Sequence, residues 1–560
     1  MKEEVKGLYW AIFLSAVAIL AVNWIWPAQE VVVEEKPVAE IKAEVKEAYE
    51  AKSDDELYSP SDRKIEDLEI ALKHDKRISV KNDKLNGSIR VKGARFDNLN
   101  LSNYKKTLEE NSSDVELLAP SETFSPYYAE FGWLSTDSTI KLPNSNTMWK
   151  VVGKELTPET PITLEWNNGM GIKFVRRISI DKNYMFNIEQ VVENNSEKNI
   201  KLYPYGMVNR IYTSNSNSAV VHEGMVGVVD GKLREFKPND LDEGEKKEFS
   251  THGGWAGFGE RYWFSAFALN NADESTVRFS KTAKDTYQTD FVGSAVEIAN
   301  GAVATSKIQF YAGAKEIALL DEYTKTHDIQ KFDLAVDFGW YYFLTKPFFY
   351  ILDFLYKMIG NMGWAILVFA ALLRLVMFPV ANKSYENMSK MKKVQPKIQA
   401  IQEEHKNDKV RLQKEMMELY KKEKINPASG CLPMFIQIPV FFSLYKVLNI
   451  AIEIRHAEFI GWIKDLSAPD PITLSYVTGL PVPSFFDLGV WPLFMGITMY
   501  LQQRMSPKPA NKDQARMFAL MPIFFMFMLG HFASGLVIYW TLSNILSIIQ
   551  QRAIMKKNGA

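Results

Sequence analysis

Five apolar runs of membrane length crowd the C-terminal half of this 560-residue chain, and they restrict its fold more than any other feature. Lipid offers no partner for backbone N–H and C=O groups, so a single apolar segment that crosses a bilayer must form an α-helix. The runs therefore predict a helical membrane core. They lie at about 361–380, 431–451, 489–504, 516–531 and 534–551.

A sixth apolar run, residues 8–26, lies near the N-terminus. Trp10 and Trp26 mark its ends, as aromatic side chains mark spans at the membrane surface. A secretory signal peptide has a similar apolar core, but no small-residue cleavage site follows this one. We therefore expect residues 1–27 to be a retained transmembrane anchor. Residues 28–56 are rich in Glu, Lys and Ala and predict a charged, solvated tether.

The hydrophobic period changes between residues 57 and 335. Segments such as 161–166 and 171–181 alternate apolar and polar residues, which is the period of a β-strand with one buried face. Turn signals such as Asp230-Gly231 separate the strands. We predict a large antiparallel β-sandwich domain for residues 57–335.

Residues 338–360 are apolar except for Lys346, Asp353 and Lys357, which share one helical face. This pattern is typical of an amphipathic helix that lies in the membrane interface. The chain is thus expected to be a multi-domain membrane protein. Its parts are an N-terminal anchor span, an external antiparallel β-sandwich domain, an interfacial helix and an α-helical core of five spans.

The distribution of Lys and Arg sets the expected orientation, because these residues are enriched in short cytoplasmic loops. The loop 382–424 holds 12 of them and the connection 504–516 holds four, whereas 452–488 holds two. We expect the two basic loops and the short basic tail, 552–560, in the cytoplasm. Six spans then place both termini in the cytoplasm and the β-sandwich on the opposite side.

Arg374 lies within the otherwise uncharged run 361–380, and the other spans contain no carboxylate that could pair with it. An arginine at membrane depth costs about 2.5–3.5 kcal/mol on insertion scales, so such residues usually face a polar cavity. At about 1.5 Å per residue, Arg374 lies roughly 20 Å from Asn361, on the cytoplasmic side of the membrane centre. We expect it to form the floor of a hydrated groove.

Polar residues recur in the later spans. Each alone is explained by an interhelical hydrogen bond, but together with Arg374 they favour a groove that contains water. They are Gln437, Ser443, Thr498, Gln502, Thr541, Ser543, Asn544 and Ser547.

The loop 382–424 carries two amphipathic stripes that predict a helical hairpin turning near 406–408. The simplest interpretation is that the stripes bury each other. Because Met-rich surfaces suit partners of varied sequence, the alternative is a docking surface for nascent hydrophobic segments or targeting factors. The stripes comprise Met388, Met391, Val394, Ile398 and Ile401, then Leu412, Met416 and Leu419.

Three segments resemble the YidC membrane protein insertases of Gram-negative bacteria: NPASGCLPMFIQIPVFFSLYKVL (426–448), RMSP (504–507) and SGLVIYWTLSNILSIIQQ (534–551). The resemblance covers essentially the whole chain. It implies an insertase and folding chaperone of the inner membrane with a periplasmic β-domain. The partners it implies are nascent membrane proteins, the Sec translocon and its accessory proteins, the ribosome or signal-recognition targeting factors, and membrane lipids.

The resemblance also implies roles for single residues. By its place shortly before the basic hairpin, Arg374 matches the groove arginine of the family, whereas Ala370 stands where a hydroxyl is sometimes found. Substrate contacts in the last span match Tyr539 and Trp540. The candidate groove then comprises Arg374, Gln437, Thr498, Gln502, Tyr539, Trp540, Ser543 and Asn544. The candidate substrate slide comprises Leu432, Pro433, Phe441, Ile523 and Met528.

The sequence contains no nucleotide-binding or H-E-x-x-H fingerprint, and its single cysteine, Cys431, predicts a small core residue. We therefore expect no enzyme activity, no cofactor, no metal and no sequence-specific nucleic-acid partner. The alternative function is a secondary transporter of an anionic solute. Transporters are commonly built from internal repeats and use intramembrane carboxylates, and the absence of both favours the insertase.

Overall fold

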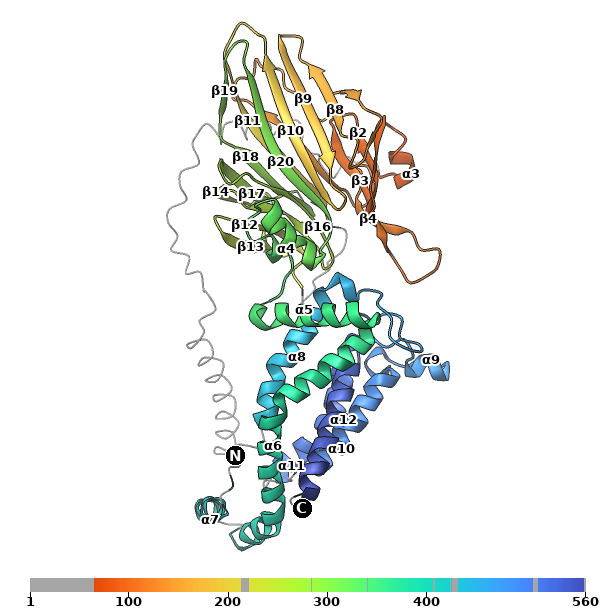
Figure 1. The fold of residues 1–560 in the computed structure, drawn as a ribbon, viewed down its shortest axis with the longest axis vertical. Helices are drawn as coiled ribbons and strands as arrows, with labels where there is room; N and C mark the ends of the chain where they lie inside the picture. Colours follow the sequence, from red (N-terminus) through yellow and green to blue (C-terminus); the bar gives the residue numbers. More distant parts are fainter. Residues whose placement is uncertain are drawn as a thin grey trace.

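The computed structural model describes residues 65–212, 221–283, 285–339, 341–405, 408–423, 425, 432–506 and 512–557. The predicted anchor (1–27) and tether (28–56) lie outside these residues, as does Cys431. The described chain forms a β-domain and a helical bundle, and helix α5 lies across the junction between them (Figure 1).

The β-domain is a sandwich of two sheets. One sheet contains, in spatial order, β14 (Lys246–His252), β17 (Glu274–Ala283), β18 (Thr286–Gly293), β11 (Ile200–Ile211), β5 (Tyr127–Leu134), β3 (Arg95–Lys105), β2 (Leu85–Arg90), β1 (Arg77–Lys81) and β7 (Glu155–Leu156), with β19 (Val296–Ile298) beside β11 and β4 (Asp114–Leu118) beside β3. The other contains β13 (Lys232–Phe236), β12 (Gly224–Val229), β15 (Trp255–Gly259), β16 (Trp263–Ala268), β20 (Val303–Ala314), β10 (Met185–Asn194), β9 (Ile172–Ile180), β8 (Ile162–Asn167) and β6 (Lys150–Val152).

Aromatic side chains from both sheets fill the space between them. Phe96 of β3 meets Phe186 of β10 and Phe310 of β20, with ring centroids 5.3 and 5.5 Å apart in edge-on contacts. Such contacts stabilise beyond the area they bury. The predicted Asp230-Gly231 turn joins β12 to β13, and both residues have positive φ, 52° and 69°. The antiparallel prediction is confirmed for the strand pairs of the described β-domain, except for β1 and β7, which run parallel.

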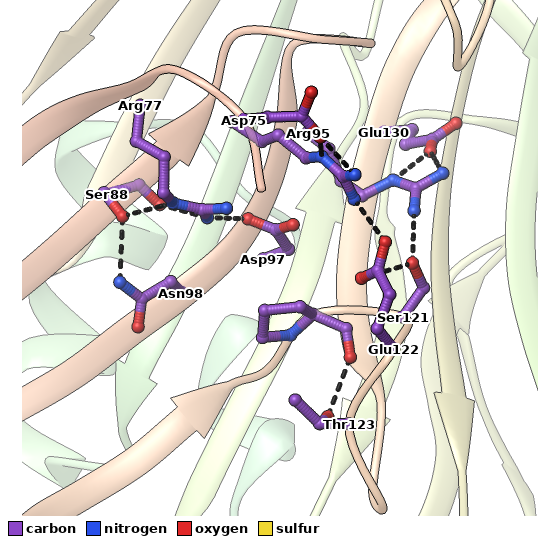
Figure 2. A network of polar contacts seen from close by, with 12 residues as sticks. Asp75, Arg77, Ser88, Arg95, Asp97, Asn98, Ser121, Glu122, Thr123 and Glu130 are labelled. Carbon is purple, nitrogen blue, oxygen red and sulfur yellow. Dashed lines mark hydrogen bonds and ion pairs between the residues drawn. The ribbon is translucent and has the colours of Figure 1, made fainter. Parts of the chain in front are cut away.

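A polar network lies at the β1–β3 side of the first sheet (Figure 2). Arg95 is paired with Glu130 of β5 and donates from Nη1 to Ser121 Oγ at 2.9 Å. Arg77 of β1 is paired with the buried Asp97 of β3. Buried charges are tolerated only when paired in this way, so the network fixes the register of these strands.

The helical elements follow the predicted spans closely. They are α3 (Leu68–Ala71), η2 (Pro238–Asp240), α4 (Ile317–Thr326), η3 (Phe332–Ala335), α5 (Tyr342–Ile359), α6 (Met362–Glu404), α7 (Lys409–Lys422), α8 (Leu432–Ile450), η5 (Ile452–Ile454), α9 (Leu474–Thr478), η6 (Ser484–Phe486), α10 (Val490–Met505), α11 (Lys512–Leu529) and α12 (Ser534–Lys557). By length and hydropathy alone, one described helix, α6, could cross a membrane.

Helix α6 is longer than the sequence analysis expected. It runs without interruption from Met362 to Glu404, through the boundary placed between the span 361–380 and the hairpin 382–424. Pro379 lies inside it and does not end it. The start of α6 is sharp because Gly360 adopts φ 79° and the Asn361 side chain accepts a hydrogen bond from the Trp364 amide at 3.1 Å. This corner sets the depth of Arg374.

The β-domain rests on the outer end of α8. Lys446 Nζ lies 2.7 Å from Asp337 Oδ2, and Arg261 donates from Nε to the Asn449 carbonyl at 2.6 Å. Beyond α8, Arg455 Nη2 donates to the Lys105 carbonyl at 2.7 Å. The β-domain and the helical core are therefore joined by several polar contacts in addition to the chain connection through α5.

Glu453 of η5 lies within this junction. Its Oε2 atom is shielded from solvent and has no hydrogen-bond partner among the described residues. Burial raises the pKa of Glu453 to about 7, and the carboxylates of Glu316 and Asp353 add to the increase, while backbone amides of Glu453 and Ile317 oppose it. The junction thus contains a carboxyl group that holds its proton far more tightly than usual.

The pKa of Glu453 predicts how stability depends on pH. Because the folded-state pKa lies above the ordinary value of 4.5, folding binds a proton, and stability falls as pH rises from about 4.5 to about 7. The penalty above this window is up to about 3 kcal/mol. We expect Glu453→Gln to raise the Tm of the purified chain at about pH 8 and to change it little at about pH 4.5.

The matched control for this prediction is Glu458→Gln, because Glu458 is exposed and paired only with the exposed Lys464 among the described residues. The control should leave the Tm nearly unchanged at both pH values. An equal Tm shift for Glu453→Gln at both pH values would mean that its carboxyl group does not titrate in this range.

Candidate functional site

One face of α12 is polar along most of its length. Tyr539, Ser543, Ser547 and Gln551 recur at four-residue intervals, so they lie above one another on the helix, and all four are buried. Helix α12 packs along both α6 and α10 (Figure 1). A polar row therefore runs through the middle of the bundle.

Arg374 of α6 contacts this row. Its Nη2 atom donates to the Ser543 carbonyl at 3.0 Å and to Ser543 Oγ at 2.9 Å. No carboxylate forms an ion pair with Arg374 among the described residues. The expectation that Arg374 lacks an acidic partner therefore agrees with the contacts, but its guanidinium is not isolated, because a neutral serine on α12 holds it.

Helices α8 and α10 add polar groups on either side of α12. Gln437 of α8 donates from Nε2 to the Tyr539 hydroxyl at 2.9 Å. Asn544 of α12 donates from Nδ2 to Thr498 Oγ1 of α10 at 3.2 Å. With Arg374 and Ser543, these residues link four helices into one polar site.

Two predicted groove residues lie outside this hydrogen-bonded set. Gln502 is half-buried on α10, one turn beyond Thr498, and its side chain makes no hydrogen bond to a described residue. Trp540 lies in an aromatic cluster, 4.7 Å from Phe441 of α8 and 6.0 Å from Phe525 of α11 between ring centroids. These contacts place Trp540 on the α8–α11 side of α12.

The candidate slide residues have mixed surroundings. Ile523 and Met528 of α11 are exposed, 52% and 43%. Phe441 is half-buried against Trp540, and Leu432 and Pro433 lie in the first turn of α8. Helix α11 therefore presents an exposed apolar surface of the type that a slide requires.

Three glutamines at the ends of the spans, Gln503, Gln550 and Gln551, were not predicted as site residues. Gln550 Nε2 donates to Asn382 Oδ1 at 2.8 Å, joining α12 to α6, and Gln503 Nε2 donates to the Phe518 carbonyl, joining α10 to α11. Gln551 completes the polar face of α12. The four-residue spacing that starts at Tyr539 could have identified Gln551. Gln551 is the last residue of the predicted span 534–551, where a polar residue is expected for another reason.

Several buried polar atoms of these helices have no hydrogen-bond partner among the described residues. They are Ser443 Oγ of α8, Gln551 Nε2 of α12 and Ser389 Oγ of α6. Buried polar groups in folded proteins are almost always hydrogen-bonded to protein or to water. The helical bundle therefore contains buried polar side-chain atoms that form no hydrogen bond with another described residue.

The hairpin formed by the end of α6 and by α7 packs much as its simpler interpretation predicted. Val394 and Ile398 of α6 are buried together with Ile425, and Met416 and Leu419 of α7 pack against them. The hairpin also has an ion pair, Lys397 Nζ to Glu423 Oε1 at 2.7 Å. The central parts of the two stripes thus pack against each other.

Two protein families match adjacent parts of the chain. Residues 77–351 match the YidC periplasmic domain, and residues 354–560 match the 60Kd inner membrane protein family. The β-domain is therefore the periplasmic domain of this family, and the helical bundle is its membrane part.

Similar proteins match this chain over most of their own length. The membrane protein insertase YidC of Rickettsia akari (strain Hartford) is 46% identical over 490 residues, which are 86% of this chain and 88% of the relative. That of Beijerinckia indica is 42% identical over 585 residues, covering 100% of this chain and 97% of the relative. A crystal structure of an active YidC insertase matches 85% of this chain and 92% of its own at 16% identity, with a TM-score of 0.37. On the strength of the two sequence relatives, the chain belongs to the YidC family of membrane protein insertases.

Proposed function

We propose that this chain performs the activity for which its family is named, the insertion of proteins into a membrane, and that it also assists their folding. The observation that carries the proposal is the contact between Arg374 and Ser543 on the polar row of α12. A positive charge held inside a membrane bundle by neutral partners can receive a polar or acidic segment of another chain. This is a binding function and not an enzymatic one.

The electrostatics of Arg374 suit this role. Only Nη2 donates to a described residue, and the side chain is half-buried, so its remaining N–H groups can meet water or a substrate carboxylate. The Ser443 hydroxyl of α8 and the Gln551 amide of α12 are buried without a hydrogen-bond partner among the described residues, which favours hydration of the bundle interior. Water and charge together lower the cost of bringing a polar segment to membrane depth.

The apolar segment of the substrate then leaves toward lipid. We propose that it moves past Phe441 and along α11, where Ile523 and Met528 are exposed. Helices α10 and α11 have 16 and 18 residues, so they are about 24–27 Å long and shorter than an average bilayer core of about 30 Å. Partitioning into lipid and the membrane potential, about 2.3 kcal/mol per charge per 100 mV, supply the free energy.

Topology and partners form part of the same proposal. The 12 basic residues of 382–424 favour a cytoplasmic hairpin, and six spans place both termini in the cytoplasm of a cell whose inner membrane holds the protein. Nascent membrane proteins are the substrates. The Sec translocon, and the ribosome or targeting factors at the hairpin, are the proposed partners.

The alternative function, transport of an anionic solute, has no support from the relatives, which are named insertases. One experiment separates the two functions. The purified chain, reconstituted in liposomes without nucleotide, should insert a single-span substrate protein. Uptake of a small anion into the same liposomes, without insertion of the protein, would overturn the proposal.

A further inference from the structure

The loop between η5 and α10 presents an apolar surface that the insertion mechanism does not use. We define the α9 loop as residues 471–486, which include α9 and η6 and contain no Asp, Glu, Lys or Arg. Tyr476, Val477 and Leu480 are 73%, 67% and 65% exposed. Such a concentration of exposed apolar side chains on an uncharged segment marks an interaction surface.

The α9 loop is held in a defined shape by polar contacts at its base. Asp487 accepts hydrogen bonds from the Ser475 amide at 2.7 Å and from Ser475 Oγ at 2.6 Å. The Leu474 amide donates to the Leu488 carbonyl at 3.1 Å. The exposed side chains are therefore displayed by an ordered turn.

The α9 loop is also fastened to α11. Phe485 stacks on Phe527 with centroids 5.4 Å apart and planes at 9°, and Phe486 meets the same ring edge-on at 5.6 Å. His531 Nε2 donates to the Ser484 carbonyl at 2.7 Å. The apolar surface of the loop thereby adjoins the exposed apolar face of α11, which faces lipid.

The position of the α9 loop in the bundle identifies what covers it. Figure 1 shows α9 projecting sideways from the end of the bundle at which α5 lies. Helix α5 itself exposes Phe343, Phe354 and Met358 at that end. Two exposed apolar elements thus lie at the same end of the bundle, and the sequence predicts that one of them, α5, lies in the membrane interface.

We propose that the α9 loop is a second interfacial anchor, which inserts its apolar side chains among the lipids of the outer leaflet. Lipid fits better than a protein partner, because protein interfaces have polar and charged rims and the α9 loop has no charge. Its Tyr, Ser and Thr side chains suit the headgroup level. Acting with α5, the anchor holds the outer end of α10 and α11 at a fixed depth in the bilayer.

Depth-dependent quenching tests this anchor. The full chain, with Cys431→Ser, is labelled with a fluorophore at Val477→Cys and placed in nanodiscs whose phospholipids carry brominated acyl chains. The control label is at Val303→Cys, because Val303 is an equally accessible position on β20 of the β-domain. Leu480→Cys provides a second loop position if Val477→Cys does not fold.

The anchor predicts that the label in the α9 loop loses most of its fluorescence to brominated lipid and resists aqueous iodide, and that the control label shows the reverse. Equal quenching of both labels by iodide would overturn the proposal. Protection of the loop label only after a membrane-protein extract is added would also overturn it, in favour of a protein partner.

Discussion

Replacement of Arg374 by Ala should slow insertion of a substrate with an acidic translocated tail by roughly thirtyfold. This factor corresponds to about 2 kcal/mol, the attraction between unit charges about 8 Å apart at an effective dielectric of about 20. Arg374→Lys should keep most of the activity, because an ammonium group supplies the charge and can still donate to Ser543. The measurement is the initial rate of insertion into liposomes that contain the purified variant.

The contact with Ser543 makes Arg374→Gln the decisive control. Glutamine can still donate to the Ser543 carbonyl but has no charge, so it separates a charge effect from a structural link between α6 and α12. If the charge of Arg374 attracts the substrate, Arg374→Gln should slow insertion of the acidic-tail substrate as much as Arg374→Ala does. It should leave the insertion rate of a neutral-tail substrate nearly unchanged. Equal losses for both tails, or full activity with Gln, would assign Arg374 a structural role.

Removal of the helical hairpin should reduce insertion of ribosome-bound substrates about tenfold, or about 1.4 kcal/mol. The deletion should span residues 390–422, because Ser384, Tyr385 and Ser389 are buried against the bundle and must remain. The loss is expected from charge, since the apolar stripes pack against each other and exposed lysines such as Lys390 and Lys414 can meet ribosomal or lipid phosphates. The measurement compares insertion from ribosome–nascent chain complexes with insertion of released substrate.

A charge variant separates recruitment from packing in the hairpin. Replacing the exposed Lys390, Lys392, Lys414 and Lys421 by Gln leaves the packed stripes and the Lys397–Glu423 pair intact. This variant should reproduce most of the loss for ribosome-bound substrates, and the loss should shrink as salt is raised. Unchanged insertion in both the deletion and the charge variant would leave the hairpin without a recruiting role.

The fold was largely predictable because membrane-length runs and period-two strands are strong signals. The spans near 431–451 and 534–551 correspond to α8 and α12 within a few residues at their starts. The continuity of α6 was not predictable, because Pro379 and the onset of charge at Lys383 both suggest a break, whereas packing against α12 holds the helix together.

The candidate site was predictable in its residue types and less so in its contacts. Arg374 and Ser543 could be selected as polar residues in apolar spans, but only the structure shows that they touch each other. Trp540 was assigned to the groove from the family resemblance, and its contacts with Phe441 and Phe525 place it in an aromatic cluster. Which polar residue meets which neighbour depends on packing, because polar residues lie on more than one side of α12: Ser543 contacts Arg374 of α6, and Asn544 contacts Thr498 of α10.

The central claim is that the polar part of a substrate enters the Arg374–Ser543 site while its apolar part meets α11. The most direct measurement is site-specific photocrosslinking of a stalled single-span substrate, with the photoreactive residue at Thr498, at Met528 or at the exposed Leu375 as control. We predict that Thr498 crosslinks the polar tail, Met528 crosslinks the apolar segment, and Leu375 crosslinks neither above background. Equal crosslinking of both substrate regions at all three positions would contradict the groove and the slide together.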